Sequence, residues 1–260
     1  MGYGTVTVMA HGLPLLYVVA LWFASTALVV WLDNRASRSF GSSLSVAGIF
    51  AVVGVGLIAV AARDGSTFAA YASFTATFLV WGYHEMSFLM GRLTGPRRSE
   101  CPAGTRGWMR FKLSAQTVIY HEIALAVTLA LLAAVTWGQA NATGAYAFAV
   151  LFAMRLSTKL NIFLGVPNFS TEMLPPHLAY LKSYFRTARF NPLMPVSLLL
   201  GSGLTYWLGS NALAASGDAA ITWSLLTGLA LLGVVEHLFL VLPIGDTALW
   251  RWAIPNAKRI

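Results

Sequence analysis

Residues 67–91 read TFAAYASFTATFLVWGYHEMSFLMG, an apolar run that carries one ionisable pair, His84 and Glu85. At about 1.5 Å of rise per residue, about 20 apolar residues cross the roughly 30 Å hydrocarbon core of a bilayer as a helix. This run is therefore long enough to span a membrane. An ionisable pair inside such a span is costly, so its presence needs an explanation.

The rest of the chain repeats this hydrophobic pattern. Of its 260 residues, 57 % are hydrophobic and 10 % are charged, whereas soluble domains carry about 25 % charged residues. Seven apolar runs are separated by Gly, Pro and charged clusters, near residues 12–32, 43–62, 67–91, 114–137, 144–166, 192–209 and 220–242. They predict an all-α, polytopic membrane helix bundle of seven transmembrane helices that forms a single domain over residues 1–260.

The distribution of basic residues predicts the orientation. With seven spans, 14 Lys and Arg residues fall on one side and Arg63 alone falls on the other. Since excess Lys and Arg marks the cytoplasm, the N-terminus is expected in the periplasm and the C-terminus in the cytoplasm. The net charge of +8 resides mainly in these loops, which predicts contact with lipid headgroups and not with nucleic acid. No basic n-region precedes the first run, so no cleavable signal peptide is expected, and the lone Cys101 excludes an intramolecular disulfide.

The loop between the fifth and sixth runs predicts one further helix, near residues 176–190. Leu178, Leu181 and Phe185 recur there at spacings of three and four, which is typical of an amphipathic α-helix. Such a helix would either lie on the inner membrane surface or pack on the bundle as a connector, because both arrangements bury the same apolar face.

Two more spans contain a coupled His and Glu, in IYHEI at 119–123 and in VVEHLF at 234–239. In the predicted topology, His84, His121 and His237 each lie six or seven residues from the cytoplasmic end of a span. That distance is about 10 Å at the helical rise. The three pairs are therefore expected at one common depth.

The fifth span adds cations to this depth. Lys159 lies seven residues before the end of that span, and Arg155 lies one turn deeper. Charged side chains inside a membrane face the bundle interior and pair with one another. We therefore expect one buried polar layer, with Asn161 as a further partner, built from His84, Glu85, His121, Glu122, Arg155, Lys159, Glu236 and His237.

Three interpretations of this layer are open. Carboxylate and imidazole ligands suit iron, manganese or zinc, and the candidate ligands are His84, Glu85, His121, Glu122, Glu236 and His237. Alternatively, a neutral His ligates the metal of a tetrapyrrole such as bacteriochlorophyll. In the third interpretation the layer is structural, with Arg155, Lys159 and Asn161 as partners in an ion and hydrogen-bond network. A shared metal site requires the three His side chains to converge, since paired metals lie about 4 Å apart.

Several stretches resemble the PuhE family of photosynthetic complex assembly proteins from anoxygenic phototrophic bacteria. They are HEMSFLMGRLTGPRR (84–98), CPAGTRGW (101–108), VIYHEIALA (118–126), RLSTKLNIFLGVPN (155–168), LPPHLAYLKSYFRTARFNP (174–192) and VVEHLFLVLP (234–243). The resemblance implies a multi-pass protein of the bacterial inner (intracytoplasmic) membrane, with its gene near that of the reaction-centre H subunit. It implies reaction-centre and light-harvesting 1 components as partners and a connection to bacteriochlorophyll. It carries over no catalytic residue.

Two classes of function therefore stand side by side. One is an assembly factor for the reaction centre and its light-harvesting 1 ring, which handles a pigment through the His/Glu layer. The other is a membrane-embedded, metal-dependent oxidoreductase or hydrolase that acts on a pigment precursor, a quinone or a lipid. A transporter is less favoured, because the layer lies off the midplane and no inverted repeat is visible.

Overall fold

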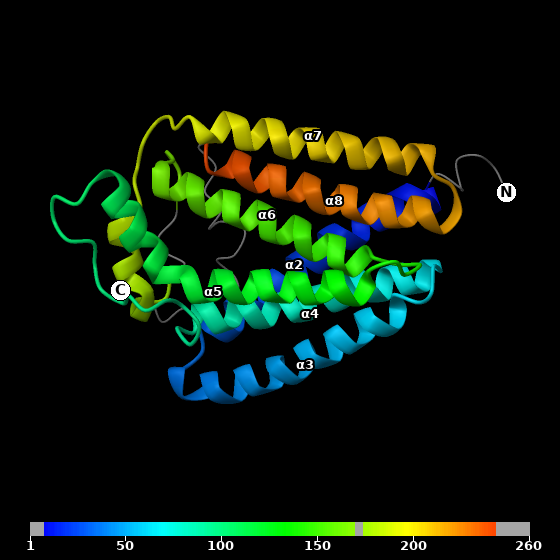
Figure 1. The fold of residues 1–260 in the computed structure, drawn as a ribbon, viewed down its shortest axis with the longest axis horizontal. Coiled ribbons are helices and arrows are strands. Elements are labelled where there is room, and N and C mark those ends of the chain that lie inside the picture. Colours follow the sequence, from blue (N-terminus) through cyan, green and yellow to red (C-terminus); the bar gives the residue numbers. More distant parts are fainter. Residues whose placement is uncertain (1–7, 170–173, 243–260) are drawn as a thin grey trace.

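The computed structural model describes residues 8–169 and 174–242, and these form a bundle of long helices (Figure 1). The long helices are α2 (Leu13–Asp33), α3 (Phe40–Ala61), α4 (Thr67–Leu89), α5 (Gly107–Thr136), α6 (Thr143–Leu164), α7 (Leu193–Ala214) and α8 (Gly217–Phe239). A π-helical turn at Val8–Gly12 precedes α2, and 3-10 helices lie at Ser37–Ser39 (η2) and Pro176–Tyr184 (η3). Over the described residues, the only extended pairing is an isolated parallel bridge between Val166 and Thr187. The all-α prediction is confirmed.

Five of the helical segments are long and apolar enough to cross a membrane. They are Met9–Asp33, Ser37–Ala61, Gly107–Thr136, Thr143–Leu164 and Gly217–Phe239. The outward side chains suit such a setting, since Val52 of α3 is 74 % exposed and Val127 of α5 is 62 % exposed. A surface of this kind is stable in lipid and unfavourable in water. The chain is thus a multi-pass membrane protein by length and composition of its helices.

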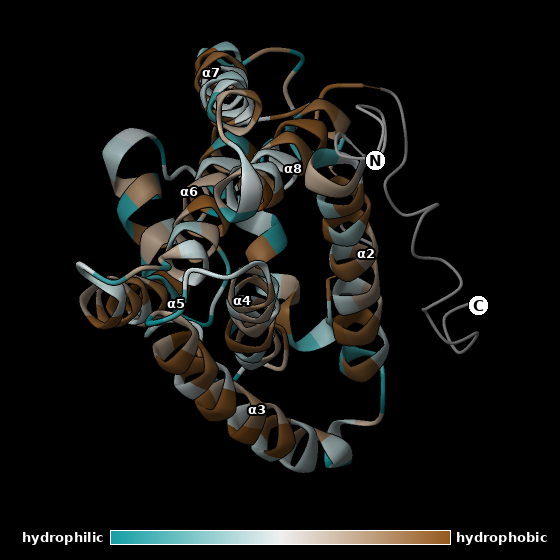
Figure 2. Ribbon diagram, turned by 90° about the vertical axis from the view of Figure 1, so that its right-hand side faces the viewer, coloured by the Kyte–Doolittle hydropathy of each residue, from teal (hydrophilic) through white to brown (hydrophobic). Residues whose placement is uncertain are grey.

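Helix α4 is less apolar than the five candidate spans because other helices enclose it. Figure 2, an end view, shows α4 between α2, α3, α5 and α6, and α8 also contacts it. Along α4, Ser73, Phe74 and Thr77 are completely buried. A helix surrounded by protein does not need a lipid-compatible surface, so small and hydroxyl residues take the place of large aliphatic ones.

These small residues let the backbones of neighbouring helices approach α4 closely. The Thr77 hydroxyl donates to the Gly144 carbonyl of α6 at 2.9 Å, and the Gly144 N–H donates to the Ser73 hydroxyl at 3.0 Å. A Cβ at Gly144 would lie only 2.5 Å from that hydroxyl oxygen. On the opposite side, a Cβ at Gly54 of α3 would lie 2.9 Å from the Ala76 carbonyl oxygen. Glycine is therefore required at both crossings.

The predicted amphipathic helix near residues 176–190 is shorter and more tightly wound in the structure. It is the 3-10 helix η3, which ends at Tyr184, and Phe185 has extended backbone angles (φ −79°, ψ 151°). A 3-10 helix repeats every three residues, which places Leu178, Leu181 and Tyr184 on one buried line. The α-helical spacing had instead predicted that Phe185 shares the apolar face with Leu178 and Leu181. The Tyr184 hydroxyl fixes this register, because it accepts from Arg97 Nε at 2.5 Å and donates to the Ser99 carbonyl at 3.1 Å.

Candidate functional site

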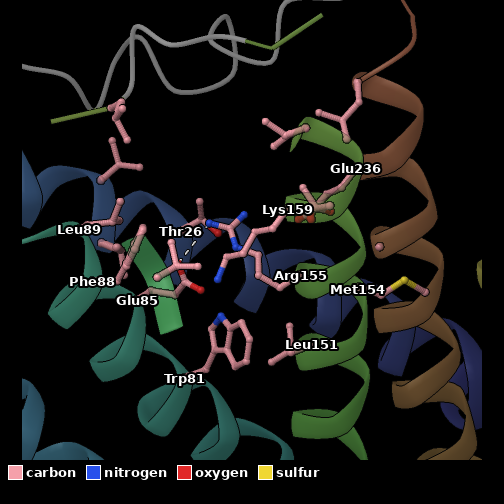
Figure 3. Close-up of a pocket in the computed structure, with 18 of the residues that line it drawn as sticks. Thr26, Trp81, Glu85, Phe88, Leu89, Leu151, Met154, Arg155, Lys159 and Glu236 are labelled. Carbon is pink, nitrogen blue, oxygen red and sulfur yellow. Dashed lines mark hydrogen bonds and ion pairs between the residues drawn. The ribbon is translucent and has the colours of Figure 1, made fainter. Parts of the chain in front are cut away.

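A cavity of about 450 Å³ lies between α2, α4, α6 and α8, at the end of the bundle that η3 covers. Its walls are largely aromatic and apolar and include Trp22, Trp81, Phe88, Leu151 and Met154. Figure 3 shows charged side chains from three helices, Glu85, Arg155, Lys159 and Glu236, around the same space. The predicted polar layer therefore borders an internal cavity.

Arg155 of α6 and Glu85 of α4 form an ion pair at this cavity. Arg155 Nη2 lies 3.2 Å from Glu85 Oε2, and the two side chains point toward one another in Figure 3. The Glu85 side chain is 11 % exposed, whereas the Arg155 side chain is 40 % exposed. Glu85 Oε1 and Arg155 Nε are buried without a hydrogen-bond partner. The pair is thus joined by one hydrogen bond and keeps capacity for more.

Lys159 and Glu122 form a second ion pair, one helical turn along α6. Lys159 Nζ donates to Glu122 Oε1 at 2.6 Å, which joins α6 to α5. The ammonium group also lies 5.5 Å from the centroid of the Phe88 ring of α4, a cation–π contact. One lysine thereby ties α6 to both α4 and α5.

The third carboxyl group, that of Glu236 on α8, has a neutral donor. The Trp22 indole Nε1–H donates to Glu236 Oε1 at 3.0 Å and so links α2 to α8. Trp22 was not predicted as a site residue, because a tryptophan in an apolar span resembles ordinary lipid-facing sequence. The only sequence signal was its place in the middle of a span, away from the interface where tryptophans usually gather.

The three predicted histidines contact neighbouring helices and do not line the cavity, as far as the described residues define it. His84 Nε2 lies 2.9 Å from the Thr128 hydroxyl of α5. His237 Nδ1 donates to the Gly233 carbonyl at 2.7 Å, and its Nε2 lies 2.9 Å from the Ser157 hydroxyl of α6. Adjacent residues on a helix are about 100° apart. When one member of a His/Glu pair faces the cavity, the other therefore faces a neighbouring helix.

His121 differs from the other two histidines. It is 0 % exposed, its ring centroid lies 4.9 Å from that of Phe88, and neither ring nitrogen has a hydrogen-bond partner. An unpartnered polar atom in an apolar surrounding lowers stability by about 1–3 kcal/mol. His121 is thus the least favourably placed member of the layer.

The donor arrangement does not support the predicted metal site. In residues 8–169 and 174–242, no three His, Cys, Asp or Glu side chains are grouped so that they could hold a metal ion. The six candidate ligands, His84, Glu85, His121, Glu122, Glu236 and His237, all lie in this part of the chain. Glu85 and Glu122 are paired with cations instead. A carboxylate held by Arg or Lys is a poorer metal ligand than a free one.

Asn161, predicted as a network partner, belongs to a chain of neutral hydrogen bonds. Its Nδ2 group donates to the Ser197 hydroxyl of α7 at 2.9 Å and to the Ser157 carbonyl at 3.0 Å. Ser157 and Ser197 are themselves 2.9 Å apart through their hydroxyl oxygens. This chain runs from α7 through α6 to His237 of α8. The serines escaped prediction because single hydroxyl groups are common in transmembrane helices and carry no charge signal.

Comparison with known proteins identifies relatives over nearly the whole chain. The sequence model of the family described as "Protein of unknown function (DUF3623)" matches residues 8–260. A Rhodobacter capsulatus protein described as "Uncharacterized 30.4 kDa protein in puhA 5'region" is 39 % identical over 248 residues, which cover 94 % of this chain and 90 % of that protein. No solved structure matches the chain.

The contrast between His121 and His237 generates a matched prediction. We expect His121→Leu to raise the free energy of unfolding by about 1 kcal/mol, because it removes two unpartnered polar atoms from a fully buried site. We expect His237→Leu to lower it by about 1–3 kcal/mol, because Ser157 keeps only Ser197 as a hydroxyl partner and the Gly233 carbonyl loses its side-chain donor. Thermal unfolding of both variants in the same detergent measures the difference. A larger stability loss for His121→Leu than for His237→Leu would contradict the inference that His237 stabilises the contact between α6 and α8.

Proposed function

Because the chain belongs to the DUF3623 family, with a close relative encoded beside puhA, we propose that it supports assembly of the photosynthetic reaction centre and its light-harvesting 1 ring. The observation that carries this proposal is the gene position of the relative, whose similarity covers almost the full length of both proteins. The gene puhA is a gene of the photosynthetic reaction centre, so the relative is encoded next to a reaction-centre gene. The resemblance of residues 84–98 and 155–168 to the PuhE family supports the same role.

The chemistry of the polar layer fits a binding or scaffolding protein better than a metal-dependent enzyme. Both cations of α6 are compensated by carboxylates from the same chain, and His84 and His237 bind side chains of neighbouring helices. The enzyme alternative required a shared ligand set, and no such group occurs in the described residues. Handling of bacteriochlorophyll remains a prediction of the resemblance; no histidine borders the cavity along the described chain.

We further propose that α4 and α7 also cross the membrane, which gives seven spans with the N-terminus in the periplasm. In Figure 1 both helices run alongside the five candidate spans. In that arrangement the loop between α3 and α4 is periplasmic and contains Arg63 alone among basic residues, whereas the loop between α4 and α5 is cytoplasmic and basic. The protein would then reside in the bacterial inner or intracytoplasmic membrane.

Fusions to alkaline phosphatase test this topology, because the enzyme is active only in the periplasm. We expect high activity for a fusion at Gly65 and low activity for one at Gly104, since excess Lys and Arg keeps the second loop in the cytoplasm. Fusions to green fluorescent protein at the same sites, which fluoresce in the cytoplasm, should give the opposite pattern. Equal phosphatase activity at both positions would place Gly65 and Gly104 on the same side, which would contradict a crossing of the membrane by α4.

Deletion and copurification in a phototrophic bacterium that carries this gene test the assembly role. We expect the deletion to lower the near-infrared absorbance of the reaction centre and light-harvesting 1 ring at least about threefold. A tagged copy should restore the absorbance and enrich subunits of these complexes after mild solubilisation. The matched control is an unrelated inner-membrane protein with the same tag and expression level. Normal absorbance in the deletion strain, together with no enrichment over the control, would overturn the proposal.

A further inference from the structure

Both cations at the cavity are paired with carboxylates of the protein, and Asp33 adds a carboxyl group to its lining, which favours an uncharged ligand over an anion. Arg155 is paired with Glu85 and Lys159 with Glu122. Glu236 adds a further carboxyl group, held by the Trp22 indole. A ligand anion would meet this carboxyl group, and a ligand cation would compete with two protein cations. In a low-dielectric interior, either case costs more than binding of a neutral molecule.

Three buried polar atoms at the cavity are left without a hydrogen-bond partner. They are Glu85 Oε1, Arg155 Nε and Thr158 Oγ1, and all three residues line the cavity. Glu85 and Thr158 are each only 8 % exposed, so bulk water does not readily reach them. A carboxylate oxygen accepts, a guanidinium N–H donates, and a hydroxyl does either. These three atoms have almost no accessible surface, whereas the Arg155 side chain as a whole is 40 % exposed. The guanidinium group of Arg155 is therefore the donor that a ligand in the cavity can reach, and it matches an acceptor such as a carbonyl oxygen.

The walls select the shape of the remainder of the ligand. Trp81 and Phe88 of α4 flank Glu85 along the cavity, and Leu151 faces them from α6 (Figure 3). Aromatic faces stack on planar rings, and a leucine side chain packs against alkyl groups. The volume of about 450 Å³ lies within the roughly 300–1,000 Å³ of small-molecule sites.

We infer that this cavity binds a neutral, lipid-soluble ring compound of the quinone and quinol class. A carbonyl oxygen of the ligand accepts from the Arg155 guanidinium group, the ring lies against Trp81 and Phe88, and the alkyl part contacts Leu151. The inference concerns binding alone and includes no redox step. It goes beyond the assembly role and does not depend on it, because the site is complete within one chain.

Gly82 offers a way to block the cavity without disturbing the ion pairs. It lines the cavity, and a Cβ built on it meets no atom within 4 Å. Gly56 of α3 also has open space at its Cβ, but it is not among the cavity residues. Both positions lie inside helices, where leucine is favoured over glycine by about 0.5–1 kcal/mol. Gly82→Leu and Gly56→Leu therefore form a matched pair of variants.

To test the inference, the purified full-length protein in detergent is titrated with decylubiquinone. Binding is measured by calorimetry and by quenching of tryptophan fluorescence. We expect saturable binding of one molecule per chain. Gly82→Leu should weaken it at least about tenfold, which corresponds to about 1.4 kcal/mol, because the new side chain occupies the ring site. Gly56→Leu should bind as the natural protein does.

Two further ligands test the chemical class. Dodecanol is neutral but has no ring, and dodecanoate is an anion of similar length; we expect both to bind at least about tenfold more weakly than decylubiquinone. Equal or tighter binding of dodecanoate would overturn the neutral assignment, and equal binding of dodecanol would overturn the ring assignment. Non-saturable uptake, or binding unaffected by Gly82→Leu, would exclude the cavity as the site. Since no reaction-centre component is present, failure here is distinct from failure of the assembly proposal.

Discussion

The ion pair between Arg155 and Glu85 sets the main constraint on this bundle. A guanidinium group inside an apolar interior is unstable unless a carboxylate lies beside it, because removal of a charge from water costs several kcal/mol. Arg155 and Lys159 lie one turn apart on α6 and meet Glu85 of α4 and Glu122 of α5. The two pairs therefore determine which faces of three helices are turned toward each other. The small residues of α4 then allow the backbones to close to the distance that the pairs require.

A division within each His/Glu pair follows from this constraint. Glu85 and Glu236 border the cavity, and Glu122 reaches it indirectly through Lys159. The neighbouring histidines are turned toward other helices, where His84 and His237 find hydroxyl partners. The layer thus has a charged inner side around the cavity and a neutral outer side between helices. Such an arrangement keeps a polar space within the bundle while the histidines contribute to packing.

Much of the helical fold and of the polar layer could be predicted from the sequence, because charge and hydropathy are strong signals in a membrane protein. The seven apolar runs are helical, and Arg155, Lys159 and the three glutamates have partners inside the bundle. The orientation of each His/Glu pair could not be predicted, since adjacent residues lie on different faces and helix rotation depends on neighbours. The neutral partners Thr128 and Ser157 carry no sequence signal, and Trp22 is marked only by its place in the middle of a span. The pitch of η3 was predicted wrongly, because leucine spacing alone does not distinguish three residues per turn from 3.6.

Energetic coupling between Arg155 and Glu85 holds α4 and α6 together, and a double-mutant cycle measures this coupling directly. Glu85→Gln, Arg155→Met and the double variant would be compared by thermal unfolding and by accumulation in the membrane. Each single change leaves an uncompensated buried charge or an unmet donor, so we expect both to be strongly destabilising. The double variant should recover stability, with a coupling free energy of at least about 1 kcal/mol. Losses that simply add in the double variant would contradict the central role of this ion pair.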